Sequence, residues 1–309
     1  MGCQKRRERS LFAIAQRMED RANVRNGSRT DFSLQTPSTT FPSTRTSPTP
    51  ARMTGPAIPA ATLIVMRDNA HAPPDLLMVE RAAKLAFAGG AMVFPGGRID
   101  AADEAAVAAH DTLDAAARIA AIRETIEESS VAVGLSPTPD PALTATLAKA
   151  LHDGASFTDL LAAHGLSLDL DQLTPFARWK PAFHQARIFD TLFFVAEAPA
   201  GDWHPTPQPG ECEAVIWIGA AELLDRIAAG HATAIFPTIR NLERLASFAT
   251  VAEARADALA HPVETISPWI EEVDGVRYLR IPDGLGYPVT REPLDRVSRG
   301  LPASPFPAA

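Results

Sequence analysis

The sequence predicts an α/β fold in which helices pack on both faces of a mixed β-sheet. Apolar segments of strand length, several of them rich in β-branched residues, occur at residues 61–66, 76–79, 191–196 and 214–218. Alanine- and leucine-rich segments typical of helices lie at about residues 101–129, 137–173 and 239–259. Strands and helices mixed in this order favour a helix–sheet–helix layering.

Composition limits the classes of partner. The chain has 309 residues, of which 46% are hydrophobic and 21% charged, and its formal net charge is −8. A negative balance gives no general attraction to nucleic acid or anionic lipid, so an anionic substrate must be bound by a few placed cations or a metal. The isolated cysteines Cys3 and Cys212 suggest neither a disulfide nor a zinc site, and a reducing cytoplasm fits them. No apolar run approaches the roughly 20 residues that span a bilayer.

The chain divides into three predicted regions. Residues 1–55 are basic and then rich in Ser, Thr and Pro, a composition that predicts disorder. Translation starts either at Met1 or at Met53, which stands just before the first structured segment. Residues 56–250 form the main predicted folded domain, with a helical insertion at about 137–175. Residues 251–309 form a C-terminal extension with a hairpin around Asp274 and Gly275.

The most informative segment is a carboxylate-rich helix. Glu124, Glu127 and Glu128 have the i, i+3, i+4 spacing that places side chains on one helical face. Carboxylates this close repel one another, and a bound cation would relieve the repulsion. Mg²⁺ prefers carboxylate oxygens and activates water toward phosphorus. Taken alone, the same string is more often a solvated acidic face.

The preceding segment favours the metal interpretation. Phe94 and Pro95 lead into Gly96 and Gly97, and glycines at a strand end let the backbone approach a phosphate. Gly96 and Gly97 are therefore predicted to bind substrate, although a Gly-Gly pair alone is usually a simple turn. A strand, a Gly-Gly turn and a carboxylate helix together indicate a metal site more specifically than either motif does alone.

This combination resembles the Nudix family. The family's box runs Gly, five residues, Glu, seven residues, then Arg-Glu-hydrophobic-x-Glu-Glu-x-Gly-hydrophobic. The chain matches it at Gly97, Arg123–Glu124, Glu127–Glu128 and Val131. The resemblance implies a Nudix-type α/β/α sandwich with a mixed sheet and hydrolysis of a diphosphate bond in a nucleotide derivative.

The resemblance also implies roles for the matched residues. Glu124, Glu127 and Glu128 would be the metal ligands and catalytic carboxylates, with Mg²⁺ as the cofactor and Mn²⁺ as an alternative. Arg123 would orient the helix by pairing with Asp103 or Glu104 rather than by touching the substrate. The general base would be one of these glutamates or a carboxylate outside the box.

The box departs from the family pattern in three ways. Thr125 occupies the first hydrophobic position, and Ser130 stands where the box has glycine, so the helix lacks its usual glycine at the left-handed position. About a dozen extra residues separate Gly97 from Arg123. Either Asp103 or Glu104 replaces the first glutamate of the box.

The long spacer is similar to that of a Nudix subgroup related to the peroxisomal coenzyme A diphosphatase of animals. That subgroup shares an expanded box, a helical insertion after it, and a Trp-x-x-Pro…Arg-x-Phe-Asp-Thr-x-Phe-Phe tract. This chain has Trp179–Pro181, then 187–194, and later Pro237–Thr238 at the start of a helix. Trp179 would stack on a base or lie in the core.

The tract before the box suggests the substrate. Leu77, Arg81, Ala82 and Gly90 fall in register with coenzyme A-cleaving members, whereas Ala86 replaces their second arginine. Two arginines are candidate substrate contacts. Arg81 would bind a substrate phosphate or pair with an acid at a strand end, and Arg187 would contact phosphate or the adenine side. Coenzyme A would yield 3′,5′-ADP and the phosphopantetheine portion.

Three alternatives to a coenzyme A diphosphatase stay open. A hydrolase of ADP-ribose or a dinucleotide would use the same chemistry, a binding module would keep the fold without turnover, and a scaffold would dock partners through the basic amino terminus. Glu211 and Glu213 precede a strand, where they are surface residues or supply a further metal ligand or the general base. The expected partner is a small nucleotide in the cytoplasm, and the sequence leaves the oligomeric state open.

Overall fold

The computed structural model describes residues 56–85, 88–181 and 188–297. Within them an eight-stranded sheet has the order β10-β7-β8-β1-β2-β3, with β4 also beside β1 and β9 also beside β2. The strands are β1 (Ile58–Asn69), β2 (Ala72–Arg81), β3 (Met92–Val93), β4 (Gly96–Arg98), β7 (Thr174–Trp179), β8 (Phe189–Glu197), β9 (Cys212–Gly219) and β10 (Thr265–Ile266). The β1–β8 and β7–β10 pairs are parallel and the other pairs antiparallel, so the sheet is mixed as predicted.

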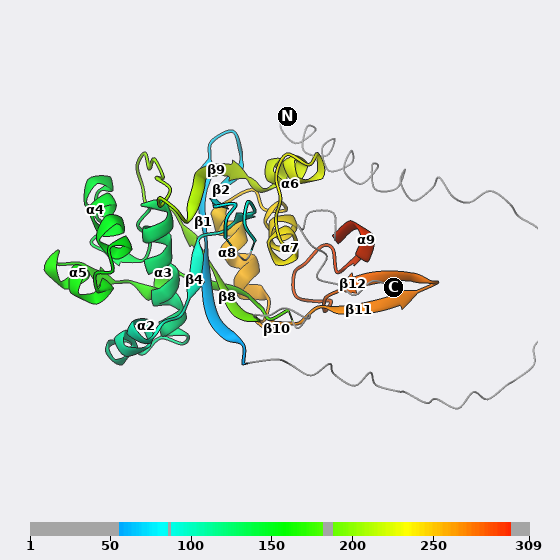
Figure 1. The fold of residues 1–309 in the computed structure, drawn as a ribbon, viewed down its shortest axis with the longest axis horizontal. Helices are drawn as coiled ribbons and strands as arrows, with labels where there is room; N and C mark the ends of the chain where they lie inside the picture. The colour runs from blue at the N-terminus through cyan, green and yellow to red at the C-terminus, as the bar shows by residue number, and fades with distance from the viewer. Residues whose placement is uncertain (1–55, 86–87, 182–187, 298–309) are drawn as a thin grey trace, which may run out of the picture. The chain divides into compact units, whose positions relative to one another are not determined.

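Helices cover both faces of this sheet (Figure 1). One face carries α2 (Ala101–Ala106), α3 (Ala115–Ser129), α4 (Pro141–His152) and α5 (Phe157–Ala163). The other face carries α6 (Ala220–Ala228), α7 (Phe236–Leu245) and α8 (Val251–Ala260). Short elements complete this part: the 3₁₀ turns η1 (Val107–Ala109) and η2 (Leu170–Gln172) and the pair β5 (Leu135–Ser136) and β6 (Ser167–Leu168). The predicted α/β/α sandwich with a helical insertion is confirmed.

Strand β1 shows why the central strands read as continuous apolar runs. Successive side chains of a strand point to opposite faces, and here both faces are covered. Leu63 and Val65 pack in the α3 layer, whereas Ile64 and Met66 pack in the layer of α7 and α8. All four side chains are at most 1% exposed.

Two predicted helices are each split in the structure. The segment expected to be helical over 101–129 forms α2, η1 and then α3, with Asp114 at φ +57° just before α3. The side chain of Asp100 caps α2, so the helix starts where predicted, but the chain turns at 110–114 and folds back. The helix expected over 239–259 is α7 and α8, because Thr250 caps a new helix by accepting a hydrogen bond from Glu253 N.

Within the predicted extension (251–309), α8 and β10 belong to the sandwich, and residues 269–293 form a three-stranded antiparallel sheet. Its strands are β11 (Trp269–Val273), β12 (Val276–Arg280) and β13 (Arg291–Pro293), followed by α9 (Leu294–Val297). The predicted hairpin is confirmed, and both Asp274 and Gly275 have the positive φ of its tight turn. The Tyr287 hydroxyl accepts from Trp179 Nε1 at 3.0 Å and donates to Asn241 Oδ1 at 2.8 Å. Trp179 is therefore a core residue that fixes the extension to the sandwich.

None of the described helices has the length and apolar character needed to cross a bilayer. The predictions for residues 1–55, Ala86 and Arg187 concern positions outside the described residues.

Candidate active site

Two glycines of strand β4 lie against β1 and against the carboxylates of helix α3. Gly96 and Gly97 pair with Thr62 and Ala61 of β1, above the middle of α3. A Cβ atom on Gly97 would overlap the carboxylate of Glu124, and one on Gly96 would overlap the backbone of β1. The Gly-Gly pair, predicted as a turn, instead forms part of strand β4, and it brings the sheet backbone against the carboxylate helix.

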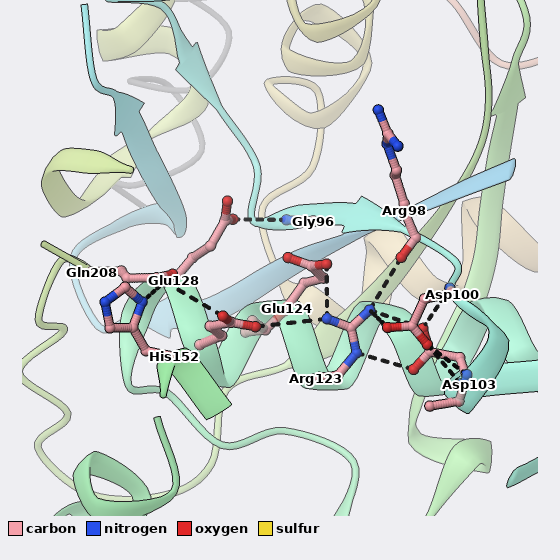
Figure 2. A network of polar contacts seen from close by, with 12 residues as sticks. Gly96, Arg98, Asp100, Asp103, Arg123, Glu124, Glu128, His152 and Gln208 are labelled. Carbon is pink, nitrogen blue, oxygen red and sulfur yellow. Dashed lines mark hydrogen bonds and ion pairs between the residues drawn. The ribbon is translucent and has the colours of Figure 1, made fainter. Parts of the chain in front are cut away.

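Arg123 links α3 to α2 and β4 (Figure 2). Its guanidinium donates to both oxygens of Asp103, at 3.0 and 2.8 Å, and to the Arg98 carbonyl at 3.1 Å. Its Nη1 donates to Glu124 Oε1 at 2.9 Å. Asp103 is only 2% exposed, whereas Glu104 is exposed. Of the two acids proposed as its partner, Arg123 therefore pairs with Asp103.

The charge of Arg123 is well compensated. Burial alone would lower the pKa of its guanidinium, but the hydrogen bonds and charges of Asp103 and Glu124 raise it above its ordinary value. Asp103 also accepts from Asp100 N, and Asp100 in turn caps α2. This capping box is visible in the sequence as Asp-x-x-Asp, and it could have indicated that a separate helix starts at 101.

Of the three glutamates of α3, Glu128 is buried, and Glu124 and Glu127 are partly exposed. Glu128 is 4% exposed and accepts one hydrogen bond, from Gly96 N at 3.0 Å. Burial and the nearby charge of Glu124 raise the pKa of Glu128 to about 8. Burial also raises the pKa of Glu124 to about 7, with Arg123 opposing and Glu127 adding to the shift. Burial raises the pKa of Glu127 as well, opposed by Arg123 and reinforced by Glu211.

These carboxylates suit a hard divalent cation. Glu124 and Glu128 extend from α3 toward β4 (Figure 2), and within the described chain no donor contacts Glu124 Oε2 or Glu128 Oε1. In the described ranges no three His, Cys, Asp or Glu side chains are placed closely enough to hold a metal ion as they stand. Buried, mutually repelling carboxylates with free oxygens are nevertheless the donor set that Mg²⁺ prefers, together with retained waters. The residues present therefore fit a divalent ion.

Further polar residues surround this group. Arg81 ends β2, its charge lowers the pKa of Glu128, and its buried Nε has no partner among the described residues. Glu211 lies close enough to raise the pKa of both Glu127 and Glu128. Gln208 contacts Glu127, although no motif in the sequence marks Gln208 as a site residue. The predicted contact Arg187 lies in a segment that the structure does not describe.

Comparison with solved structures identifies the family. A NUDIX hydrolase from Alicyclobacillus acidocaldarius is 30% identical and superposes with a TM-score of 0.58. The match covers 66% of this chain and 97% of that one. This chain is a Nudix hydrolase. As such it is an enzyme that hydrolyses the pyrophosphate bond of a nucleotide derivative, and enzymes of this family generally use divalent metal ions.

Other structures with this fold are more distant from this Nudix hydrolase. The NUDIX domain of Shewanella oneidensis NrtR, complexed with ADP ribose, is 13% identical, with a TM-score of 0.38 and coverage of 65% of this chain and 90% of that one. DR0079 from Deinococcus radiodurans is 18% identical, with a TM-score of 0.35 and coverage of 65% and 88%. No family model matches the sequence.

The end of the Nudix helix explains one departure from the box. Ser130 has φ +56° and ψ +31° at the end of α3, so serine adopts the left-handed conformation that glycine takes more readily. We expect Ser130→Gly to raise the free energy of unfolding by about 0.5–1 kcal/mol, since left-handed strain exceeds the entropy cost of glycine. Urea denaturation would measure this.

Ser129→Gly is the matched control, because Ser129 is helical and buried and should lose stability on the same change. A loss of stability in Ser130→Gly would contradict the assignment of strain to this residue.

Proposed function

We propose that this Nudix hydrolase cleaves the diphosphate of coenzyme A or an acyl-coenzyme A, using Glu124, Glu127 and Glu128 as ligands for Mg²⁺ or Mn²⁺. The observation that carries the catalytic part is that Glu128, which is buried, and Glu124, which is partly buried, face the glycines of β4, with Glu127 beside them on α3. A cation there would neutralise their charge and approach a phosphate lying along the glycine backbone.

The chain's own residues supply positioning and proton transfer. When bound, the divalent ion would supply charge neutralisation and a water of lowered pKa. Arg123 holds Glu124 by its Nη1, and the Gly96 amide holds one oxygen of Glu128. A carboxylate of this group takes the proton of the attacking water. The water oxygen then bonds to phosphorus as the bridging P–O bond breaks.

The coenzyme A preference rests on the segment before the box. Leu77, Arg81 and Gly90 follow the tract of coenzyme A-cleaving relatives. The buried Arg81 Nε, which lacks a described partner, supports a role in binding a substrate phosphate near Glu128. Hydrolysis of ADP-ribose or a dinucleotide would use the same carboxylates, so only the products distinguish the substrates.

The test is product analysis of the wild-type enzyme with coenzyme A, acetyl-coenzyme A, ADP-ribose and NADH, with Mg²⁺ or with EDTA. We expect Mg²⁺-dependent release of 3′,5′-ADP from the coenzyme A substrates. Turnover of only ADP-ribose or NADH would overturn the substrate proposal. Turnover that persists in EDTA would overturn the metal proposal.

A further inference from the structure

Two side chains from outside the carboxylate helix are linked to Glu127, one directly and one through the other. Gln208 lies in the segment before β9 and is 4% exposed. Its Nε2 contacts Nδ1 of His152, the last residue of α4, and lies 3.4 Å from Glu127 Oε1 (Figure 2). The other oxygen of Glu127 lies 3.6 Å from Arg123 Nη1. Glu127 is thus held between a guanidinium and an amide.

The backbone around Gln208 is attached to the site on both sides. Thr206 N donates to the Ser129 carbonyl at the end of α3, at 2.9 Å. The Gln208 carbonyl accepts from Cys212 N, the first residue of β9, at 3.1 Å. On the opposite side, Leu151 packs in the core beneath α4 and fixes His152 beside the amide. The position of Gln208 is therefore set by the fold.

The oxygen of the Gln208 side-chain amide has no described partner. Oε1 is buried and receives no hydrogen bond from any residue in the described ranges. Reversing the amide would place this oxygen against the Glu127 carboxylate, so that two acceptors would face each other. An amide with Nε2 toward Glu127 is therefore favoured. A buried acceptor without a donor is unfavourable, and a polar site commonly supplies that donor as a bound water.

We propose that Gln208 is a positioning residue of the hydrolytic site. Its Nε2 orients Glu127, and its Oε1 accepts a hydrogen bond from a water molecule bound at the carboxylate group. His152 fixes the direction of the amide, so the helical insertion contributes to the active site. The inference rests on the proposed role of Glu124, Glu127 and Glu128 as the cation site.

The test measures Mn²⁺ binding without substrate, by electron paramagnetic resonance of the free ion, beside kcat and KM. In Gln208→Leu we expect Mn²⁺ affinity and kcat each to fall about 10- to 100-fold, the range for residues that orient metal ligands. KM should change less than threefold. The matched control is Gln172→Leu, which removes a partly buried amide bonded to Asp169 and Gly134 and should leave Mn²⁺ affinity unchanged.

A second pair of variants separates positioning from folding. His152 is exposed, so His152→Ala should fold normally and still weaken Mn²⁺ binding. His152→Asn places an acceptor near the position of Nδ1 and should restore much of the affinity. Wild-type Mn²⁺ affinity in both Gln208→Leu and His152→Ala would overturn the inference. A wild-type enzyme that binds no Mn²⁺ would instead overturn the proposed metal site.

Discussion

Glu128→Gln is expected to lower kcat/KM by on the order of 100- to 1,000-fold, the range for removing one preorganised electrostatic contact. The amide keeps an acceptor for Gly96 N–H but loses the charge that would hold the cation. The fold should survive, since the change also removes repulsion between Glu128 and Glu124. Steady-state kinetics and the thermal midpoint of the same preparation would measure both effects.

The matched control is Glu104→Gln. Glu104 is exposed and lies outside the Arg123 contacts, so its loss should leave kcat/KM within about twofold of wild type. If Glu128→Gln retained more than a tenth of wild-type activity, Glu128 would not be a ligand that the reaction requires. If Glu104→Gln lost activity as severely, the first acid of the box would have to be reassigned.

Arg123→Met is expected to lower the free energy of unfolding by about 3–5 kcal/mol, the range for breaking a buried ion pair by removing one partner. Asp103 is 2% exposed and would be left buried without the guanidinium that meets both its oxygens. Glu124 would also lose its only described donor. Urea denaturation at pH 7, with m-values compared, would measure the loss.

Two further variants show whether the unpaired acid causes this loss. Adding Asp103→Asn to Arg123→Met should recover part of the stability, because the amide still accepts from Asp100 N without a buried charge. Arg226→Ala removes an ion pair with Glu222 that is at least half exposed, and should change stability by less than about 1 kcal/mol. A loss under 1 kcal/mol in Arg123→Met would show that the pair contributes little.

The sequence predicted the layers of the fold because its strands are apolar on both faces. It predicted the glutamate cluster because the box residues are close together in the sequence. Glu124, Glu127 and Glu128 follow one another on one helix, so their convergence needs no tertiary information. Gln208 reaches Glu127, and His152 reaches Gln208, only through the packing of α4 and the segment before β9, which no local pattern encodes. The helix break at 110–114 was not predicted, because the alanine-rich sequence on both sides of the turn is typical of one continuous helix.

Because of the same break, residues that are far apart in the sequence lie next to each other in the site. Asp103 and Arg123 are 20 residues apart in sequence, yet their side chains are in contact, so the chain between them forms a closed loop with fixed ends. Lengthening such a loop raises its closure entropy slowly, by about 0.6 kcal/mol for each doubling. The exposed turn at residues 113–114 is therefore a suitable insertion point for an affinity tag or a fluorophore-binding peptide just before α3.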